Sequence, residues 1–390
     1  MAKIRHAQIV GLAGREGTFS VDFNEDLNIF WGMNGSGKTS FLKILHSALT
    51  GDPSYIVRVP FKSASVTFEV SSGERYTRTI RKTSRRPSKR ELEFIEDLAA
   101  SGQAVEEFML MEMSRQMAWK TEPEGPVRRL RHGYLPISRM TDLVRGSRHV
   151  STGRRDVGGL LDEAQIDEEF ARQTLALWRE YNNQALIKIR RAQEQGLAEV
   201  LSAILTGERS RRRTKNADTI PSDLAFTLVT SFFQQQRISP QLSTREKFQE
   251  NYEKNALLRD VVARIADVEV SIRMAQEPQR RLTNLLSSLF SRGKEVVLDS
   301  RSVAVRVGRE EIPIESLSSG EKQIVRILLE CLAAGNHCIL IDEPELSLHV
   351  DWQHRLVESM RAVNDEVQII LATHSPEVMA EIPNSRVFEL

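Results

Sequence analysis

Residues 32–39 have the sequence Gly-Met-Asn-Gly-Ser-Gly-Lys-Thr and match the pattern G-x-x-x-x-G-K-[S/T] in full. They follow an apolar run, Leu27–Trp31, that predicts a strand. They precede Ser40–Leu49, whose apolar spacing predicts a helix that ends at Gly51. A glycine-rich loop between a strand and a helix N-terminus presents backbone N–H groups to a phosphate. This stretch therefore predicts a P-loop in an α/β fold.

Each part of this loop has an expected task in binding ATP and Mg²⁺. Lys38 is expected to reach the β- and γ-phosphates, and the Thr39 hydroxyl to bind Mg²⁺. The glycines allow the backbone to turn its N–H groups toward a phosphate. The predicted ATP-binding residues of this segment are Asn34, Gly35, Ser36, Gly37, Lys38, Thr39 and Ser40.

A second apolar run ends in two carboxylates. Cys338–Ile341 predicts a strand buried on both faces, and Asp342 and Glu343 follow it directly, as in the Walker B pattern. A parallel strand delivers such residues to the carboxyl edge of the sheet, where ligands bind. We expect Asp342 to hold Mg²⁺ through water and Glu343 to polarise the water that attacks ATP.

Composition and charge place the chain among ordinary folded proteins. Its 390 residues are 40% hydrophobic and 27% charged, with a net charge of +1, which argues against a disordered chain. Cys331 and Cys338 lie in apolar runs, which argues against a disulfide framework or a zinc site. No apolar run approaches the ~18 residues of a membrane span, and the N-terminus lacks the apolar core of a signal peptide. We therefore expect a cytoplasmic protein without a membrane partner.

The middle of the chain has helical patterning. Apolar residues along Leu258–Leu289 alternate at spacings of three and four, as in a heptad repeat, with Gln279 in one polar slot and Pro278 as a candidate kink. A looser helical pattern precedes it at Ile166, Phe170, Leu177 and Tyr181. The basic, proline-containing stretch 207–222 separates the two parts, which predicts a helical or short coiled-coil hairpin. An ordinary helical subdomain is the alternative.

Strand and helix patterns return after this helical part. Val296–Val307 predicts strands, Gly320–Ala334 predicts a helix, and Gln368–Ala372 predicts another buried parallel strand. Short alternating runs predict further strands at Ala7–Val10, Phe19–Phe23, Phe61–Val70, Tyr76–Ile80 and His132–Ile137. We thus predict an ATPase head that is split in sequence around an inserted helical hairpin. The predicted N-terminal lobe, hairpin and C-terminal lobe are residues 1–155, 156–292 and 293–390.

Three further motifs complete a set that resembles the SMC/RecF-like branch of the ABC ATPases. Leu317–Glu321 (Leu-Ser-Ser-Gly-Glu) is similar to the ABC signature motif. Asp342–His349 (Asp-Glu-Pro-Glu-Leu-Ser-Leu-His) and Ala372–Pro376 (Ala-Thr-His-Ser-Pro) resemble the Walker B with D-loop and the switch-histidine motif of this branch. Asn34 fits its form of the P-loop. Within the branch, the chain most resembles compact bacterial anti-phage ATPases: OLD-type nucleases and the ATPase subunits of Septu, PARIS and some retrons.

The resemblance implies an ABC-type ATPase head that works as a homodimer or a higher homo-oligomer. In that family the signature of one head covers the ATP of the other. Ser318, Ser319 and Gly320 would donate hydrogen bonds to the γ-phosphate in trans, and His374 would contact it in cis. A structural role at the strand end is the usual alternative for a lone histidine. The implied catalytic residues are Glu343 and His374, and the implied Mg²⁺ ligands are Thr39 and Asp342.

Some positions depart from the family pattern. His349 stands where transport-type ABC proteins have an aspartate. Gly11 and Leu12 replace the usual Phe-Arg pair, which leaves the adenine contact unassigned. The Q-loop glutamine also stays open, with three candidates that are Gln103, Gln116 and Gln165.

The resemblance suggests a sensor or scaffold that controls a separate effector, a nuclease or another toxin, in anti-phage defence. The effector is expected to be separate because Val387–Leu390 predicts the last strand of the head and leaves no nuclease residues to assign. A RecF-type ATPase that binds DNA during repair is one alternative. A nucleotide-gated assembly platform with little turnover is another, although Glu343 argues against it.

Two basic clusters are candidates for contact with the phosphates of DNA or RNA. A solvated face that pairs with local acidic residues is an equally good interpretation. The first cluster comprises Arg75, Arg78, Arg81, Lys82, Arg85, Arg86, Lys89 and Arg90. The second comprises Arg209, Arg211, Arg212, Arg213 and Lys215.

Overall fold

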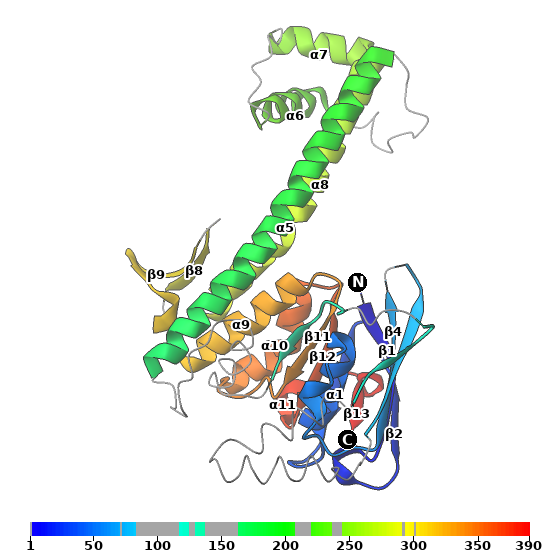
Figure 1. The fold of residues 1–390 in the computed structure, drawn as a ribbon. Coiled ribbons are helices and arrows are strands. Elements are labelled where there is room, and N and C mark those ends of the chain that lie inside the picture. Colours follow the sequence, from blue (N-terminus) through cyan, green and yellow to red (C-terminus); the bar gives the residue numbers. More distant parts are fainter. Residues whose placement is uncertain are drawn as a thin grey trace, which may run out of the picture. The chain divides into compact units, whose positions relative to one another are not determined.

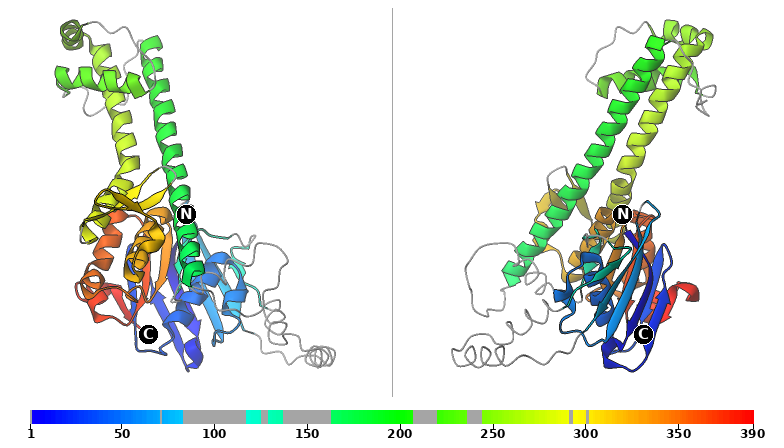
Figure 2. Two further views of the ribbon diagram at one scale, coloured as in Figure 1. Left: turned by 90° about the vertical axis from the view of Figure 1, so that its left-hand side faces the viewer. Right: turned by 45° about the vertical axis from the view of Figure 1, so that its right-hand side comes forward.

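The computed structural model describes two compact units (Figures 1 and 2). One is Met1–Trp178 with Leu282–Leu390, here called the head, and the other is Arg179–Arg281, here called the arm unit. The described residues are 2–70, 72–82, 117–124, 129–136, 163–206, 220–235, 244–290, 293–299 and 302–390. Gln103, Gln116, the first basic cluster beyond Lys82 and the whole second cluster lie outside the described residues.

A parallel sheet forms the centre of the head. Its five strands follow the order β13-β3-β12-β11-β7, and every neighbouring pair is parallel. Every residue of β11 and β12 is buried, because helices or other strands cover both faces, as the continuous apolar runs predict. The strands are β3 (Leu27–Trp31), β7 (Gly133–Leu135), β11 (Cys338–Asp342), β12 (Gln368–Thr373) and β13 (Val387–Glu389).

A second, antiparallel sheet has the order β2-β1-β4-β5-β6. Strands β4 and β5 form the hairpin that the alternating pattern predicts, and β4 alternates between buried and partly buried side chains. The strands are β1 (Ala2–Val10), β2 (Thr18–Asp22), β4 (Ser63–Val70), β5 (Arg75–Arg81) and β6 (Lys120–Glu122).

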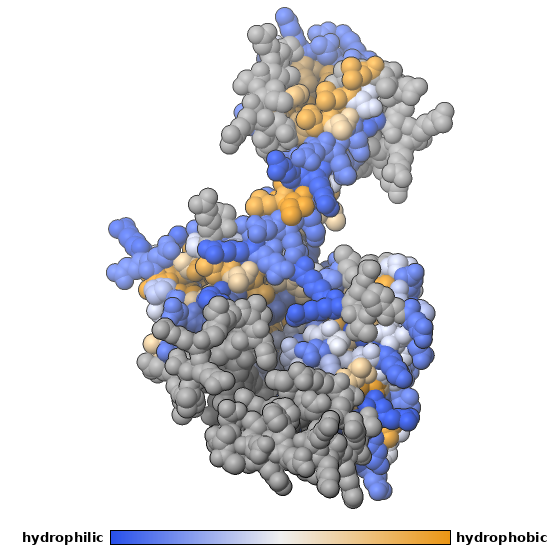
Figure 3. Space-filling view, in the orientation of Figure 1, coloured by the Kyte–Doolittle hydropathy of each residue, from blue (hydrophilic) through white to orange (hydrophobic). Residues whose placement is uncertain are grey.

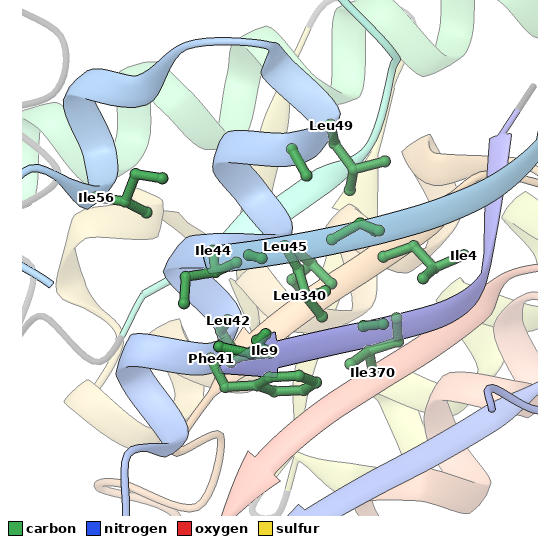
Figure 4. Close-up of a cluster of buried hydrophobic side chains, with 14 of the residues drawn as sticks. Ile4, Ile9, Phe41, Leu42, Ile44, Leu45, Leu49, Ile56, Leu340 and Ile370 are labelled. Atoms are coloured by element: carbon green, nitrogen blue, oxygen red, sulfur yellow. The ribbon is translucent and has the colours of Figure 1, made fainter. Parts of the chain in front are cut away.

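Helix α1 (Lys38–Thr50) shares one hydrophobic core with both sheets (Figure 4). The side chains of this core come from β1, α1, β11 and β12, and include Ile4, Ile9, Phe41, Leu45, Leu340 and Ile370. The P-loop is thus anchored on its C-terminal side by a helix whose apolar face is fully buried. Burial of each such side chain contributes about 1.5–3 kcal/mol.

Further helices cover the parallel sheet. Helix α9 (Ser319–Ala334) packs against β7 and β11, and α10 (Val350–Val363) packs against α9 and the short α11 (Pro376–Met379). A small antiparallel sheet precedes them, formed by β8 (Lys294–Leu298), β9 (Val303–Val307) and β10 (Glu310–Ile312). Single 3₁₀ turns occur at Leu12–Gly14, Pro53–Ile56, Ile314–Ser316 and Asn384–Arg386.

Two long helices, α5 (Glu163–Thr206) and α8 (Ala256–Leu289), contribute to both units and provide the predicted helical hairpin. Of the stretch 207–222, where a turn is expected, residues 207–219 lie outside the described residues. Helices α6 (Ser222–Gln235) and α7 (Arg245–Lys254) follow α5 before α8 begins. The apolar residues Ala225, Val229 and Phe232 recur at helical spacing on α6 and join the core of the arm unit.

The seam of α8 follows the predicted heptad, and α8 continues through Pro278. Its buried seam residues are Val261, Ile265, Val268, Ile272, Leu282, Leu286 and Leu289. On α5 the expected Leu177 is only partly buried, and Trp178 is fully buried in its place. Trp178 takes this place because the inward-facing residues of α5 recur at spacings of four, four and three, which is an 11-residue repeat. These buried or partly buried residues are Phe170, Thr174, Trp178, Tyr181, Ala185, Ile189, Ala192, Gly196, Val200 and Ala203.

Large apolar side chains also lie on the surface of the arm unit. Leu186 and Ile187 on α5, and Val270 and Met274 on α8, are each more than half exposed. Figure 3 shows hydrophobic patches on the surface of this unit. Scattered exposed apolar residues are ordinary, so these residues alone do not define a binding surface.

The close contact between Gly196 and Val268 gives a stability test of the arm unit. A Cβ at Gly196 would overlap Cγ2 of Val268. Alanine normally stabilises a helix interior by about 1 kcal/mol relative to glycine. Here we expect Gly196→Ala to lower the free energy of unfolding by roughly 1–3 kcal/mol, because the core is overpacked. Denaturant titration of the full chain measures this change.

Val268→Ala removes the overlapping methyl groups and provides the control. Alone it should destabilise the chain, because it leaves a small cavity. Combined with Gly196→Ala it should recover part of the lost stability, since the new methyl group fills that space. Additive losses in the double variant would contradict the contact.

Candidate nucleotide-binding site

The loop 32–39 has the backbone geometry that its glycines predict. Gly35 and Gly37 have φ values of 82° and 103°, in the region that favours glycine. At Gly32 a Cβ would lie 2.6 Å from Ser36 Oγ, so the loop closes too tightly for any side chain there. Helix α1 begins at Lys38, directly after this turn. The loop therefore forms a nest of N–H groups at a helix N-terminus, the geometry that binds phosphate.

Lys38 connects the loop to the end of β11. Its side chain is only 5% exposed, and Nζ donates hydrogen bonds to the carbonyls of Gly32 at 2.7 Å and Met33 at 3.4 Å. The same Nζ lies 3.3 Å from Glu343 Oε1. The structure thus brings together the P-loop lysine and the predicted catalytic carboxylate, which are far apart in the sequence.

Asp342 has the surroundings of a residue built to hold a cation. Its side chain is buried, and within the described residues neither carboxylate oxygen has a hydrogen-bond partner of good geometry. Burial raises the pKa of Asp342 to about 7, although the Thr39 hydroxyl and the Lys38 ammonium oppose this rise. A buried carboxylate without compensation is costly. Its oxygens and the Thr39 hydroxyl are hard ligands of the kind Mg²⁺ prefers, so the predicted residues fit the ion.

Glu343 lies at a strained corner after β11. It has a φ of 48°, and its backbone N–H donates to the carbonyl of Ala372 at 2.7 Å. Its Oε2 makes a short hydrogen bond with Nδ1 of His374. Burial would raise the pKa of Glu343, but the neighbouring Glu345 carboxyl, His374 and Lys38 hold it below its ordinary value. The residue is therefore kept as a carboxylate, the form that can accept a proton.

Glu345 is a site residue to which sequence analysis assigned no role. Its Oε1 accepts hydrogen bonds from Thr373 Oγ1 at 2.6 Å, from the His374 N–H at 3.0 Å and from the Ser375 N–H at 3.2 Å. Burial raises its pKa. The available sequence signal was a second acid two residues after Glu343, in a loop that follows a buried strand. Sequence spacing does not reveal which partner such an acid meets.

Three groups that could act as metal ligands gather beside His374. Ligand atoms of Glu343, Glu345 and His374 lie within 4.8 Å of one another, close enough to surround an ion. Glu345 Oε1 accepts hydrogen bonds, and Glu343 Oε2 is hydrogen-bonded to His374 Nδ1. Glu345 Oε2 is buried and has no hydrogen-bond partner among the described residues.

The signature motif forms the start of α9. Ser318 caps the helix in a capping box: its Oγ accepts from the Glu321 N–H, and its own N–H donates to Glu321 Oε2 at 2.8 Å. The backbone of Gly320 lies so close to the D-loop that only glycine fits, since a Cβ there would lie 2.5 Å from the carbonyl oxygen of Ser347. Ser318 and Ser319 are exposed. No hydrogen bond or ion pair joins Ser318–Gly320 to the P-loop in the described part of the chain.

His349 and Gln165, two residues left open by the sequence, have structural positions. His349 caps α10 by accepting a hydrogen bond from the Asp351 N–H at 3.4 Å. The His349 ring thus supplies the acceptor that Ser, Thr, Asp or Asn usually supplies at a helix N-cap. Gln165 lies on the exposed surface of α5, so the Q-loop glutamine stays unassigned.

A cavity of about 220 Å³ adjoins the P-loop. Its apolar wall comes from Leu12, Phe19 and Leu390, its charged wall from Arg15 and Glu16, and Ser36 of the P-loop borders it. The Ser36 hydroxyl is buried and has no hydrogen-bond partner among the residues that the structure describes. The lining of this cavity includes Leu12, at the position where the adenine contact was left open.

Three members of the first basic cluster have structural partners. Arg75 Nε donates to Glu69 Oε2 at 3.1 Å. Arg78 is buried, and its guanidinium donates to the carbonyls of Ala48 and Leu49 at the end of α1. Lys82 Nζ donates to the carbonyls of Val57 and Val59, both at 2.8 Å. These contacts favour the structural interpretation for Arg75, Arg78 and Lys82 themselves.

One protein family is similar to part of the chain. The family described as "AAA domain, putative AbiEii toxin, Type IV TA system" matches residues 190–380. The matched part contains the signature motif, the end of β11 and His374, but not the P-loop.

Two curated relatives are named as retron ATPases. The chain is 32% identical over 90 residues to the Retron Vc95 probable ATPase of Vibrio cholerae serotype O1 biovar El Tor. It is 26% identical over 109 residues to the Retron Ec83 probable ATPase of Escherichia coli. The matches cover 20% and 25% of this chain, which spans 18% and 19% of the length of these two relatives. They agree with the resemblance to SMC/RecF-like ATPases that the motifs predict.

Solved structures of SMC heads are also similar. The Smc head domain of Pyrococcus furiosus with an extended coiled coil is 15% identical, and the match covers 97% of this chain and 92% of that one, with a TM-score of 0.41. The SMC head domain of Thermotoga maritima is 13% identical, with coverages of 97% and 91% and a TM-score of 0.38. The fold assignment itself rests on the strand order and the P-loop described above.

None of the helices in the described ranges is both long enough and apolar enough to cross a membrane.

The raised pKa of Asp342 predicts a stability that depends on pH. The folded pKa is about 7, against an ordinary value of 3.8, so the folded chain resists losing this proton. Stability should therefore fall as the pH rises from about 4 to about 7 and stay lowered above that range. Asp342→Asn should match the parent near pH 4 and exceed its free energy of unfolding at pH 8 by roughly 1–4 kcal/mol. Denaturant titrations without nucleotide at both pH values measure this; an equal difference at both would contradict it.

Proposed function

We propose that this chain is an ATP-hydrolysing, SMC-like ATPase that dimerises on ATP and controls a separate effector in anti-phage defence. The observation that carries the proposal is one connected set of contacts. Lys38 of the P-loop touches Glu343, and Glu343 touches His374. Glu343 and His374 directly follow β11 and β12, and Lys38 follows the loop after β3. These three strands are parallel neighbours in the sheet, and ligands bind at the carboxyl edge of such a sheet.

The residues divide the work of binding between them. The N–H groups of residues 34–39 and the Lys38 ammonium would hold the phosphates, and the Ser36 hydroxyl is available at the same place. Thr39 and Asp342 would hold Mg²⁺, which neutralises charge on the phosphates when it is bound. Binding the ion would also give the orphaned Asp342 oxygens a partner, which favours its uptake.

Glu343 and His374 would act on the hydrolytic step. Glu343 is held as a carboxylate, so it can orient a water molecule and accept its proton. The hydrogen bond to Glu343 uses Nδ1 of His374, which leaves Nε2 of the ring available for the γ-phosphate. A chain that only binds nucleotide has no use for such a base, so this arrangement favours turnover over a passive platform.

The second half of each site would come from a partner chain. Ser318 and Ser319 are exposed at the N-terminus of α9, where the free N–H groups of the first turn attract anions. A homodimer would place this helix end on the γ-phosphate bound by the other chain. The effector is proposed as a separate nuclease or toxin from the resemblance to defence ATPases, and the retron names of two relatives support that choice.

Glu343→Gln tests the catalytic assignment. The variant should bind ATP and Mg²⁺ like the parent, because the shape of the side chain is kept. Its hydrolysis should fall by roughly 10²–10⁴-fold, since the amide cannot accept the proton. The ATP-bound dimer should accumulate and be visible by light scattering. Glu358→Gln, on the exposed face of α10, is the matched control and should behave like the parent. Normal turnover by Glu343→Gln would overturn the assignment.

A mixture of two inactive variants tests the shared site. Ser319→Arg should block closure of the dimer, and it spares the capping box that Ser318→Arg would break. Lys38→Ala should abolish tight ATP binding. In a mixed dimer, one site combines an intact P-loop with an intact signature, so the mixture should regain part of the ATPase rate. Parent-like turnover by Ser319→Arg alone would rule out a site shared between chains.

A further inference from the structure

Glu345 is buried between the two loops that carry Glu343 and His374. It is 5% exposed, and a buried carboxyl is retained only where its partners offset the cost of desolvation. Its partners are three consecutive residues, Thr373, His374 and Ser375, which all donate to the single oxygen Oε1. Glu345 therefore ties the loop after β12 to the loop after β11.

Glu345 also restrains the imidazole of His374. The backbone N–H of His374 lies 3.0 Å from Oε1, and the ring Nδ1 of the same residue lies 3.2 Å from that oxygen. Glu345 Oε1 thus contacts both the backbone nitrogen and the ring nitrogen Nδ1 of His374. The same ring nitrogen, Nδ1, also makes the short hydrogen bond with Glu343 Oε2.

We propose that Glu345 is a positioning residue that fixes the His374 imidazole against Glu343 and so supports hydrolysis without touching the nucleotide. The inference rests on the proposed ATPase function. Groups that position a catalytic side chain through hydrogen bonds matter because a displacement of about 1 Å at the reacting centre can cost roughly 10²-fold in rate.

The loop after β12 has a second anchor, so the chain should still fold without Glu345. Ser375 Oγ donates to Gln353 Oε1 at 2.9 Å, and Gln353 Nε2 donates to the carbonyl of Leu348 at 3.0 Å. Helix α10 thus holds the loop from its other side. Removal of Glu345 should release the His374 ring and leave the strand in place.

Steady-state kinetics of two variants provide the first test. Glu345→Ala removes the acceptor, and we expect kcat to fall roughly 10–100-fold while KM for ATP changes less than about threefold. Glu345→Gln keeps an oxygen that can accept the same three hydrogen bonds, so it should recover most of the rate. A rise in KM with an unchanged kcat would contradict the positioning role, as would a glutamine variant as impaired as the alanine variant.

Glu330→Ala is the matched control for loss of a buried acid. Glu330 lies on α9, is 9% exposed and pairs with Arg326 at 2.8 Å. Its loss should lower the thermal stability but leave kcat close to that of the parent. If Glu330→Ala reduces kcat as much as Glu345→Ala, general destabilisation explains the effect and the proposal fails.

A double-mutant cycle with His374→Ala asks whether Glu345 acts through the histidine. If it does, adding Glu345→Ala to His374→Ala should change kcat by less than about twofold, because the positioned group is already gone. If the two residues act independently, the fold-losses in kcat of the two single variants should multiply in the double variant. That result would overturn the proposal, even if both single variants are impaired.

NMR of ¹⁵N-histidine-labelled chains gives a measurement that needs no hydrolysis. The His374 signal, assigned with His374→Gln, should be alike in the parent and Glu345→Gln, and shifted or broadened in Glu345→Ala. If the parent shows no ATPase activity, the proposed function fails, and this comparison still decides the role of Glu345. An unchanged His374 signal in Glu345→Ala would overturn the inference.

Discussion

The site depends on the alignment of three parallel strand ends. In the central sheet Ala372 of β12 is paired with Asp342 of β11 on one side and with Phe30 of β3 on the other. This register places the residues that follow each strand side by side at one edge. The contact between Lys38 and Glu343, and the contact between Glu343 and His374, exist only because of it. A shift of one strand by a single residue would separate these side chains.

The same edge concentrates groups that oppose folding. Asp342 is buried with a raised pKa, and Glu343 adopts a positive φ that is uncommon outside glycine. Such features persist where the surrounding structure holds them, and here α1 and the fully buried strands β11 and β12 do so. The buried core thus stabilises a sheet edge that carries the unfavourably buried carboxylate of Asp342 and the strained backbone of Glu343. Such local destabilisation is common in binding sites.

The arm unit is held together by the packing of apolar side chains along its long helices. Its long helices use two repeats, a heptad on α8 and an 11-residue pattern on α5, which favour opposite supercoil hands. The two helices approach each other closely at Gly196, where a Cβ would overlap Val268. Helices α6 and α7 contribute the remaining apolar side chains of this core, among them Phe232, Phe248 and Tyr252.

The sequence by itself determined the local features. The P-loop, the buried strands β3, β11 and β12, helix α9 and the heptad of α8 all follow from spacing within one short segment. Only the tertiary structure decided which distant groups meet. It placed Glu345 on the backbone of His374, turned Arg78 and Lys82 inward to carbonyl groups, and packed α6 and α7 into the core of the arm unit. The periodicity of a sequence indicates which face of a helix or strand is apolar. The hydrogen-bond partner of a polar side chain depends instead on strand register and packing, because these determine which donors and acceptors lie within reach.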